Sequence, residues 1–196
     1  VLGLIIAIIR TSYDSIKNKK PNFILRAANA FCQLYLTVIR GTPMMVQLLV
    51  MGFVIMVPKT DTATIVCGII TLGINSGAYV AEIVRSGLMS INVGQSEAGR
   101  SLGFNYPQTM MYIITPQMFK AVLPTLCNEF IALLKETSVA GYVGVIDLTK
   151  AGNIIAGRTF IYFIPLIAVA LIYLVIVMIL SWLVSILERR LRKSER

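Results

Sequence analysis

The sequence predicts an all-α, polytopic membrane protein of about five transmembrane helices, formed by a single domain over residues 1–196. Hydrophobic residues make up 57% of the chain and charged residues only 14%, whereas a soluble domain carries about 25% charged residues. The mean hydropathy is correspondingly high, at +0.79. Because so few charged side chains could not cover the surface of a soluble fold, we expect a membrane domain with a handful of spans.

The net charge of +9 is concentrated beside apolar runs. One basic cluster lies within residues 10–26 and the other within residues 189–196. Basic clusters that flank apolar segments are typical of the cytoplasmic edges of membrane proteins. We therefore expect contact with membrane lipid, and we expect no nucleic-acid partner.

The residue types that are missing exclude several kinds of chemistry. The chain contains no histidine, which removes His-based catalytic triads and the commonest metal ligand. Cys32, Cys67 and Cys127 lie far apart in apolar surroundings and are expected to be packing residues. The glycine-rich loop that binds nucleotide phosphates does not occur. We expect no metal site, no cofactor and no enzymatic activity in this chain.

The first two predicted spans are both irregular. Residues 1–9 are apolar, but Arg10 follows, and a bilayer crossing needs about 20 residues. We expect this run to be the truncated remainder of a first span. A second span is predicted over residues 27–57, with an interruption at residues 40–43, where a glycine and a proline break helical continuity.

Three further spans are predicted. Residues 62–84 are uncharged over most of their length, and residues 161–187 carry no charge at all. Trp182 lies near one end of the latter segment, which suits anchoring at the membrane interface. The weakest candidate covers residues 110–135, where Pro124 could locally free backbone carbonyls.

Five crossings place the two termini on opposite sides of the membrane. If both basic clusters face the cytoplasm, the N-terminus lies outside and the C-terminus inside the cell. Residues 58–61 and 137–158 then fall outside, and residues 85–110 fall inside. The expected location is the plasma (inner) membrane.

The polar stretch within residues 94–117 carries a recognisable spacing. Glu97 begins Glu-Ala-Gly, Gly103 follows after three further residues, and Pro116 closes the pattern. This resembles the EAA signature of ABC importer permeases. The sequence departs from that signature at Gly99, where the family has alanine, and at Thr115, where it has leucine.

Further blocks extend the resemblance over most of residues 22–192. They look like the polar amino acid permeases of type I ABC importers, and they lie at residues 40–49, 75–88, 94–103, 128–141 and 161–191. The resemblance implies a permease for polar or basic amino acids such as arginine, histidine, lysine or glutamine. It also implies ATP-binding cassette subunits that bind ATP and Mg²⁺, a second permease subunit in a homo- or heterodimer, and an extracytoplasmic amino-acid-binding protein.

By the same resemblance, residues 89–108 form a coupling loop whose short helices dock onto the ATPase subunits. Gly94 and Gly103 can supply turns at either end of such a helix. The alternative is a solvated loop with a contact between Glu97 and Arg100 at i,i+3. The candidate coupling residues are Glu97, Ala98, Gly99, Arg100, Leu102 and Gly103.

Polar side chains at membrane depth are candidates for the transport pathway, because burying an ionisable group there costs on the order of 3 kcal/mol. The substrate-binding candidates are Gln47, Asn75, Glu82, Asn128, Glu129 and Asp147. Glu129 and Glu136 would share one face of an unbroken helix. A pocket with such carboxylates would suit a cationic amino acid.

Each candidate also has a structural interpretation. Glu82 could pair with Arg85 one turn later. Asn128 and Glu129 could form interhelical hydrogen bonds, and Asp147 could be a hydrated side chain of an outer loop. Arg40 could meet a substrate carboxylate, a helix C-terminus or a lipid phosphate.

Two other classes of protein compete with the importer. An ion-coupled secondary transporter or channel could use Glu82 and Glu129 as proton or ion ligands, but it gives no reason for the EAA spacing. A membrane scaffold that only anchors partners is the third class.

Overall fold

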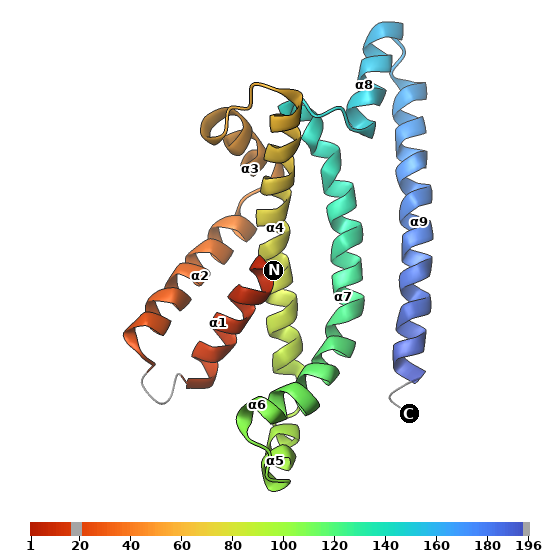
Figure 1. Ribbon diagram of the computed structural model, residues 1–196. Helices are drawn as coiled ribbons and strands as arrows, with labels where there is room; N and C mark the ends of the chain where they lie inside the picture. Colours follow the sequence, from red (N-terminus) through yellow and green to blue (C-terminus); the bar gives the residue numbers. More distant parts are fainter. Residues whose placement is uncertain (17–20, 194–196) are drawn as a thin grey trace.

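The computed structural model describes residues 1–16 and 21–193, and every regular element within these ranges is a helix. The long helices α4, α7 and α9 run side by side, and short helices lie at both ends of the molecule (Figure 1). The all-α prediction is therefore confirmed for the described part of the chain. Members of the two basic clusters at positions 17, 19, 20 and 196 lie outside the described residues.

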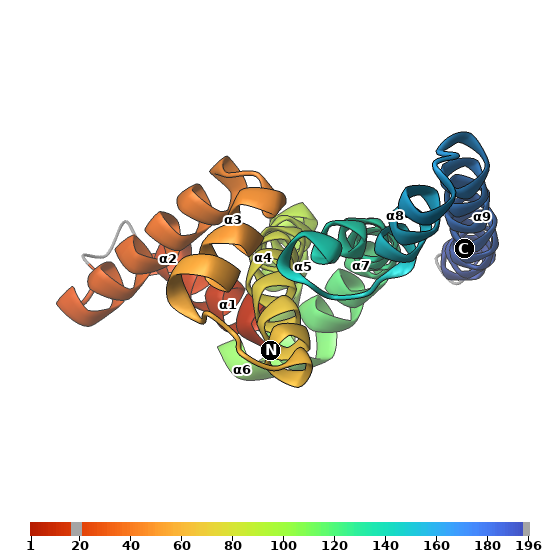
Figure 2. The same cartoon turned by 90° about the horizontal axis from the view of Figure 1, so that it is seen from above.

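The central element is α4 (Asp61–Ser90), which begins where the Thr60 side chain accepts a hydrogen bond from the Ala63 amide, at 3.2 Å. Figure 2 shows α1, α2 and α3 on one side of α4, and α7, α8 and α9 on the other. Helix α2 is held to α4 by a small apolar core in which Cys32 and Leu36 pack against Ala78 and Ala81. Cys32 and Cys67 are buried and unpaired, as expected of packing residues.

The N-terminal helices are α1 (Leu2–Ile16) and α2 (Phe23–Gly41), and the chain turns sharply after α2. The next segment consists of α3 (Met44–Val50) and the π-helical turn η2 (Met51–Ile55), bent by 107° from α2. Thr42 is extended, with φ −119° and ψ 144°, as a residue before proline tends to be. The predicted interruption at residues 40–43 is confirmed. Residues 27–57, however, form no straight span but a broken span or a re-entrant loop.

The second half of the bundle contains α7 (Thr115–Glu136) and α9 (Phe163–Lys193). Met118 and Val122 of α7 pack against Val84 of α4. The helix continues through Pro124, so the local disruption suggested by that proline does not interrupt it. Glu129 and Glu136 consequently lie on one unbroken helix.

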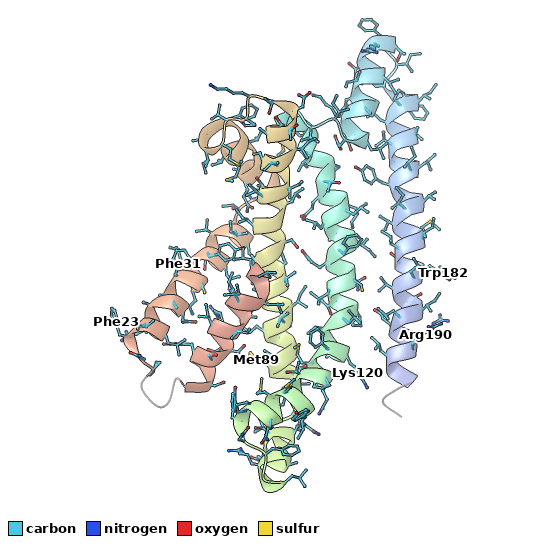
Figure 3. The ribbon with its side chains drawn as sticks, in the orientation of Figure 1. Phe23, Phe31, Met89, Lys120, Trp182 and Arg190 are labelled. Carbon is cyan, nitrogen blue, oxygen red and sulfur yellow. The ribbon has the colours of Figure 1, made fainter. Side chains whose placement is uncertain are left out.

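Length and composition single out α4 and α9 as helices that can cross a membrane, with the bent pair of α2 and α3–η2 as a possible third. Trp182 on α9 and Phe23 and Phe31 on α2 extend outward from the bundle (Figure 3) and are 63%, 81% and 73% exposed. Apolar side chains with this exposure are suited to lipid or to a partner helix rather than to water.

The short helices gather at the two ends of the molecule. At one end, the same end as the C-terminal end of α9, lie α5 (Val93–Ser101), α6 (Tyr106–Thr109) and the π-helical turn η3 (Met110–Ile114) (Figure 1). At the opposite end lie the 3-10 helix η4 (Thr137–Val143) and α8 (Leu148–Thr159), which packs against the start of α9.

Candidate coupling loop and transport pathway

The polar loop folds into a compact pair of helices with defined ends. The side chain of Asn92 caps α5 by accepting a hydrogen bond from the Gly94 amide at 2.8 Å. Gly94 therefore lies inside the first turn of α5 and does not supply the turn predicted for it. At the other end Gly103 has φ +83°, a conformation that glycine adopts at little steric cost. The Phe104 amide donates back to the Gly99 carbonyl at 3.1 Å, which closes the helix as a Schellman-type cap.

Gly99 is buried between α5 and the segment that leads back into the membrane. A Cβ atom added to Gly99 would lie 2.8 Å from Thr109 Cγ2, 2.9 Å from Thr109 Oγ1 and 3.0 Å from Ile113 Cδ1. Thr109 itself is only 2% exposed. Glycine at the alanine position of the signature therefore has a packing cause, because α5 and α6 approach too closely for a methyl group.

The remaining loop candidates form the outer face of α5. Glu97, Ala98, Arg100 and Leu102 are exposed, and Leu102 reaches 72%. Arg100 Nε donates to the Ser96 carbonyl at 3.4 Å, and within the described residues Glu97 and Arg100 form no ion pair. The alternative of a self-contained Glu97–Arg100 contact is thus not found. The exposed residues of α5 and its C-cap thus include one acidic, one basic and one large apolar side chain.

The loop is held to the membrane helices by its inner face. Asn105 and Gln108 form a capping box at the start of α6, with hydrogen bonds of 2.9 and 3.0 Å. Gln117 on α7 donates to Gln95 on α5 at 3.1 Å, and Pro116 lies in the first turn of α7. These contacts join α5 and α6 to the first turn of α7.

Gln47 and Asn75 meet at the bend between α2 and α3. Asn75 Nδ2 donates to Gln47 Oε1 at 2.9 Å. Gln47 Nε2 in turn lies within hydrogen-bond distance of the Ile39 carbonyl (2.7 Å) and of the Thr42 carbonyl and hydroxyl (3.0 and 2.8 Å). Gln47 is thus occupied in stabilising the end of α2, where helix carbonyls lack intrahelical partners.

Asn75 keeps one free acceptor. The residue is 2% exposed, and its Oδ1 atom is buried without a hydrogen-bond partner. A buried polar atom without a partner costs about 1–3 kcal/mol. A cavity of about 400 Å³, lined mostly by apolar side chains of α2, α3 and α4, adjoins Gln47 and Thr71.

Glu82 belongs to a charged cluster that joins α1, α2 and α4. Its carboxylate oxygens lie 3.2 Å from Arg40 Nη1 and 3.2 Å from Arg85 Nη1. Arg85 Nη2 also lies 2.9 Å from Asp14 Oδ2, and the Arg40 guanidinium lies 5.8 Å from the Tyr79 ring centre. The predicted Glu82–Arg85 pair is confirmed. Because two arginines already neutralise Glu82, the ion-coupled transporter loses one of its two proposed ligands.

The three other candidates do not join these groups. Asn128 is exposed and Glu129 half-buried on α7, on the opposite side of α4 from the Gln47–Asn75 pair. Asp147 caps α8 by accepting hydrogen bonds from the amides of Thr149 and Lys150, at 3.1 and 3.0 Å. Asp147 therefore has a local structural role. The described residues contain no group of three or more acidic, cysteine or histidine side chains that could hold a metal ion.

Sequence reasoning missed several partners. Arg10 was expected only as a member of a basic cluster and Asp14 was not considered, yet Arg10 lines the cavity beside Glu82 and Asp14 pairs with Arg85. The Tyr35 hydroxyl donates to the Ile74 carbonyl and links α2 to α4. The only available signal was the occurrence of polar residues inside apolar helices, which marks internal contacts but does not identify their partners.

The described residues form a bundle of helices, of which α4 and α9 are long and apolar enough to cross a membrane, with an exposed helical loop at one end. The chain belongs to the family described as binding-protein-dependent transport system inner membrane component, whose model matches residues 2–193. It is accordingly an integral, multi-pass permease subunit of an ABC transporter and not an enzyme. The coarse prediction from the EAA spacing is confirmed.

Known proteins similar to this chain agree with that assignment. The glutamine transport system permease protein GlnP of Escherichia coli K12 is 37% identical over 167 residues, covering 84% of this chain and 76% of that protein. A crystal structure of an amino acid ABC transporter with histidines superposes with a TM-score of 0.84 at 39% identity, covering 96% and 83% of the two chains. The inward-facing methionine transporter MetNI, at 20% identity and a TM-score of 0.73, shares the fold.

Proposed function

We propose that this chain is the membrane-spanning subunit of an ATP-driven importer for polar or basic amino acids. Its similarity to GlnP favours glutamine, and its similarity to an amino acid transporter crystallised with histidines extends the range to basic side chains. The observation that carries the proposal is the outer face of α5, where Glu97, Arg100 and Leu102 are exposed together beside the Gly103 turn.

The proposed assembly contains four kinds of partner. A second permease subunit, the same or a sister chain, completes the pathway. Two ATP-binding cassette subunits dock on the coupling loop of residues 89–108 and bind the ATP and Mg²⁺. An amino-acid-binding protein delivers the substrate from outside, and lipid covers the exposed apolar faces.

The proposed topology has five spans, with the N-terminus outside and the C-terminus in the cytoplasm. The spans correspond to α1, the bent pair of α2 and α3–η2, α4, α7 and α9. The end of α9 that leads into the basic tail lies at the same end of the molecule as α5 and α6 (Figure 1), which supports a cytoplasmic coupling loop.

Transport in this proposal is mechanical. Closure of the ATPase subunits moves α5, and the Gln95–Gln117 hydrogen bond and Pro116 pass that movement to α7. Because α7 packs against α4, the bundle rocks around a substrate site, as in alternating access. Asn75 Oδ1 accepts a hydrogen bond from the substrate, and Glu129 attracts a cationic one. Gln47 holds the bend, and Asn128 lines the opposite wall.

Reconstitution in lipid nanodiscs or vesicles with the ATPase and the binding protein tests the proposal. We expect uptake of labelled glutamine or arginine that requires ATP, and loss of both uptake and ATPase co-purification for Glu97→Lys. Lys59→Glu, a charge reversal at the far end of the molecule, serves as the matched control. Uptake driven by an ion gradient alone, or unchanged coupling in Glu97→Lys, would refute the proposal.

A further inference from the structure

A cavity of about 490 Å³ lies between α1, α2 and α4. Its polar lining consists of Arg10, Gln33, Thr37, Arg40 and Glu82. The volume is within the range of sites for small ligands, which extends from about 300 to 1,000 Å³. These side chains come from three different helices.

The charges around the cavity do not cancel. Arg40 and Arg85 share the single carboxylate of Glu82, and Arg85 also pairs with Asp14. Arg10 makes no ion pair within the described residues, and its Nε atom is buried without a hydrogen-bond partner. Three guanidiniums thus face two carboxylates, and one positive charge is left over at Arg10.

A buried guanidinium without a carboxylate partner is costly, and buried charges in proteins are normally paired. The Glu82 carboxylate cannot compensate Arg10, because it already accepts from two arginines. Gln33 and Thr37 are exposed to the cavity and make no side-chain hydrogen bond within the described residues. The cavity therefore supplies two guanidinium forks, an amide and a hydroxyl to one guest.

We propose that this cavity binds an oxyanion between the guanidiniums of Arg10 and Arg40, with Gln33 and Thr37 as additional hydrogen-bond donors. The oxyanion is the carboxylate of a transported amino acid or the phosphate of a lipid headgroup. Both groups present paired oxygens to the N–H fork of arginine, which matches them in bidentate geometry. The carboxylate source rests on the proposed function, whereas the phosphate source does not.

The neighbouring surface of α2 is compatible with either guest. Leu34 and Val38, next in sequence to Gln33 and Thr37, are 61% and 50% exposed and could lie along an acyl chain. Arg40 lies at the C-terminal end of α2, next to the bend that leads to the Gln47–Asn75 pair. The oxyanion site therefore adjoins the segment that lines the proposed substrate site.

The assembled transporter in nanodiscs allows both sources to be tested. In nanodiscs of phosphatidylcholine alone, equilibrium binding of labelled L-glutamine is compared with that of L-glutaminamide, which lacks the carboxylate. In nanodiscs that also contain phosphatidylglycerol, native mass spectrometry counts the anionic lipid retained per permease. Arg10→Gln is measured in both experiments, and Arg26→Gln, an exposed arginine on α2 outside the cavity, is the matched control.

If the guest is a carboxylate, Arg10→Gln should weaken the binding of glutamine about tenfold or more. The same substitution should leave the binding of glutaminamide unchanged. A phosphate guest gives retained phosphatidylglycerol that is lost in Arg10→Gln. Should Arg10→Gln fail to assemble, Arg10→Lys retains the charge without the fork, and Thr37→Val removes only the hydroxyl; both should weaken the same guest to a smaller degree.

Equal behaviour of the Arg10 and Arg26 variants in both experiments would overturn the site. That outcome together with intact ATP-driven uptake leaves the proposed function standing. Conversely, a wild-type transporter that shows no ATP-driven uptake refutes the proposed function, while retention of phosphatidylglycerol still tests the cavity.

Discussion

Gly99→Ala restores the alanine of the EAA signature, and we expect it to destabilise this protein. The new methyl group would lie 2.8 Å from Thr109 Cγ2 and 2.9 Å from Thr109 Oγ1. Neither atom moves easily, because Thr109 is buried and its branched side chain is stiff at χ1. Its hydroxyl is also held by the Asn105 carbonyl at 3.1 Å.

The magnitude follows from two opposing effects. Overpacking a filled site costs about 1–3 kcal/mol, while alanine is preferred over glycine inside a helix by about 1 kcal/mol. The net destabilisation is therefore about 1 kcal/mol, and Gly99→Val should exceed it. Thr109→Ala removes both clashing atoms, so the double variant Gly99→Ala/Thr109→Ala should recover stability relative to the sum of the two single changes.

Melting curves with a thiol-reactive dye provide the assay, since Cys32 and Cys67 are buried and unpaired and react on unfolding. Purified permease is compared with both single variants and the double variant, together with co-purification of the ATPase. We expect a favourable coupling energy of about 1 kcal/mol or more between positions 99 and 109. A higher melting temperature for Gly99→Ala, with no coupling to Thr109, would show that the close contact does not control this position.

Three further substitutions are predicted from single contacts. Gly103→Ala forces a side chain into the left-handed region at φ +83° and should lower the stability of the permease by about 1–2 kcal/mol. It should also lower co-purification of the ATPase. Gly157→Ala, which places a methyl group in open space on α8, is the control and should change neither. Gln47→Leu leaves the carbonyls at the end of α2 without their donor and should lower stability by about 1–3 kcal/mol; unchanged melting and uptake would show that the bend needs no side-chain support. Arg85→Gln breaks the ion pairs to Asp14 and Glu82 and should lower the melting temperature. Arg158→Gln, which changes an exposed arginine on α8, should lower it less; equal melting temperatures would contradict a structural role for the charged cluster.

Local chemistry explains which parts of the fold could be predicted. The break at residues 40–43 follows from a proline that lacks an amide and pushes Thr42 into an extended conformation. The end of α5 follows from Gly103, because few other residues adopt a positive φ. Gly94 shows the limit of this reasoning, since a glycine permits a turn without requiring one, and here Asn92 caps the helix instead.

The long-range contacts could not be predicted because no local period encodes them. Arg40 and Glu82 are 42 positions apart in sequence, and Gln47 bonds across the bend to Asn75. The first pair requires that α2 pack beside α4, and the second also involves the 107° bend between α2 and α3–η2, which residues 40–43 permit but do not set. The sequence therefore suggests Gln47 as a substrate ligand, whereas in the structure its side-chain amide donates to the carbonyls at the end of α2.

Four buried side-chain atoms of the described residues have no hydrogen-bond partner, and two of them, Arg10 Nε and Asn75 Oδ1, have opposite hydrogen-bonding character. A guanidinium attracts a carboxylate, and an amide oxygen accepts from an ammonium or an amide N–H. Arg10 lies on α1 and Asn75 on α4, and these two helices pack against each other. An amino acid carries both complementary groups, so a guest could satisfy the two positions in turn as α2 and α4 rock against each other. Because each position lacks only one type of group, Arg10→Gln should reduce the preference for a substrate that has the carboxylate, and Asn75→Leu should reduce the preference for a substrate that has the complementary N–H.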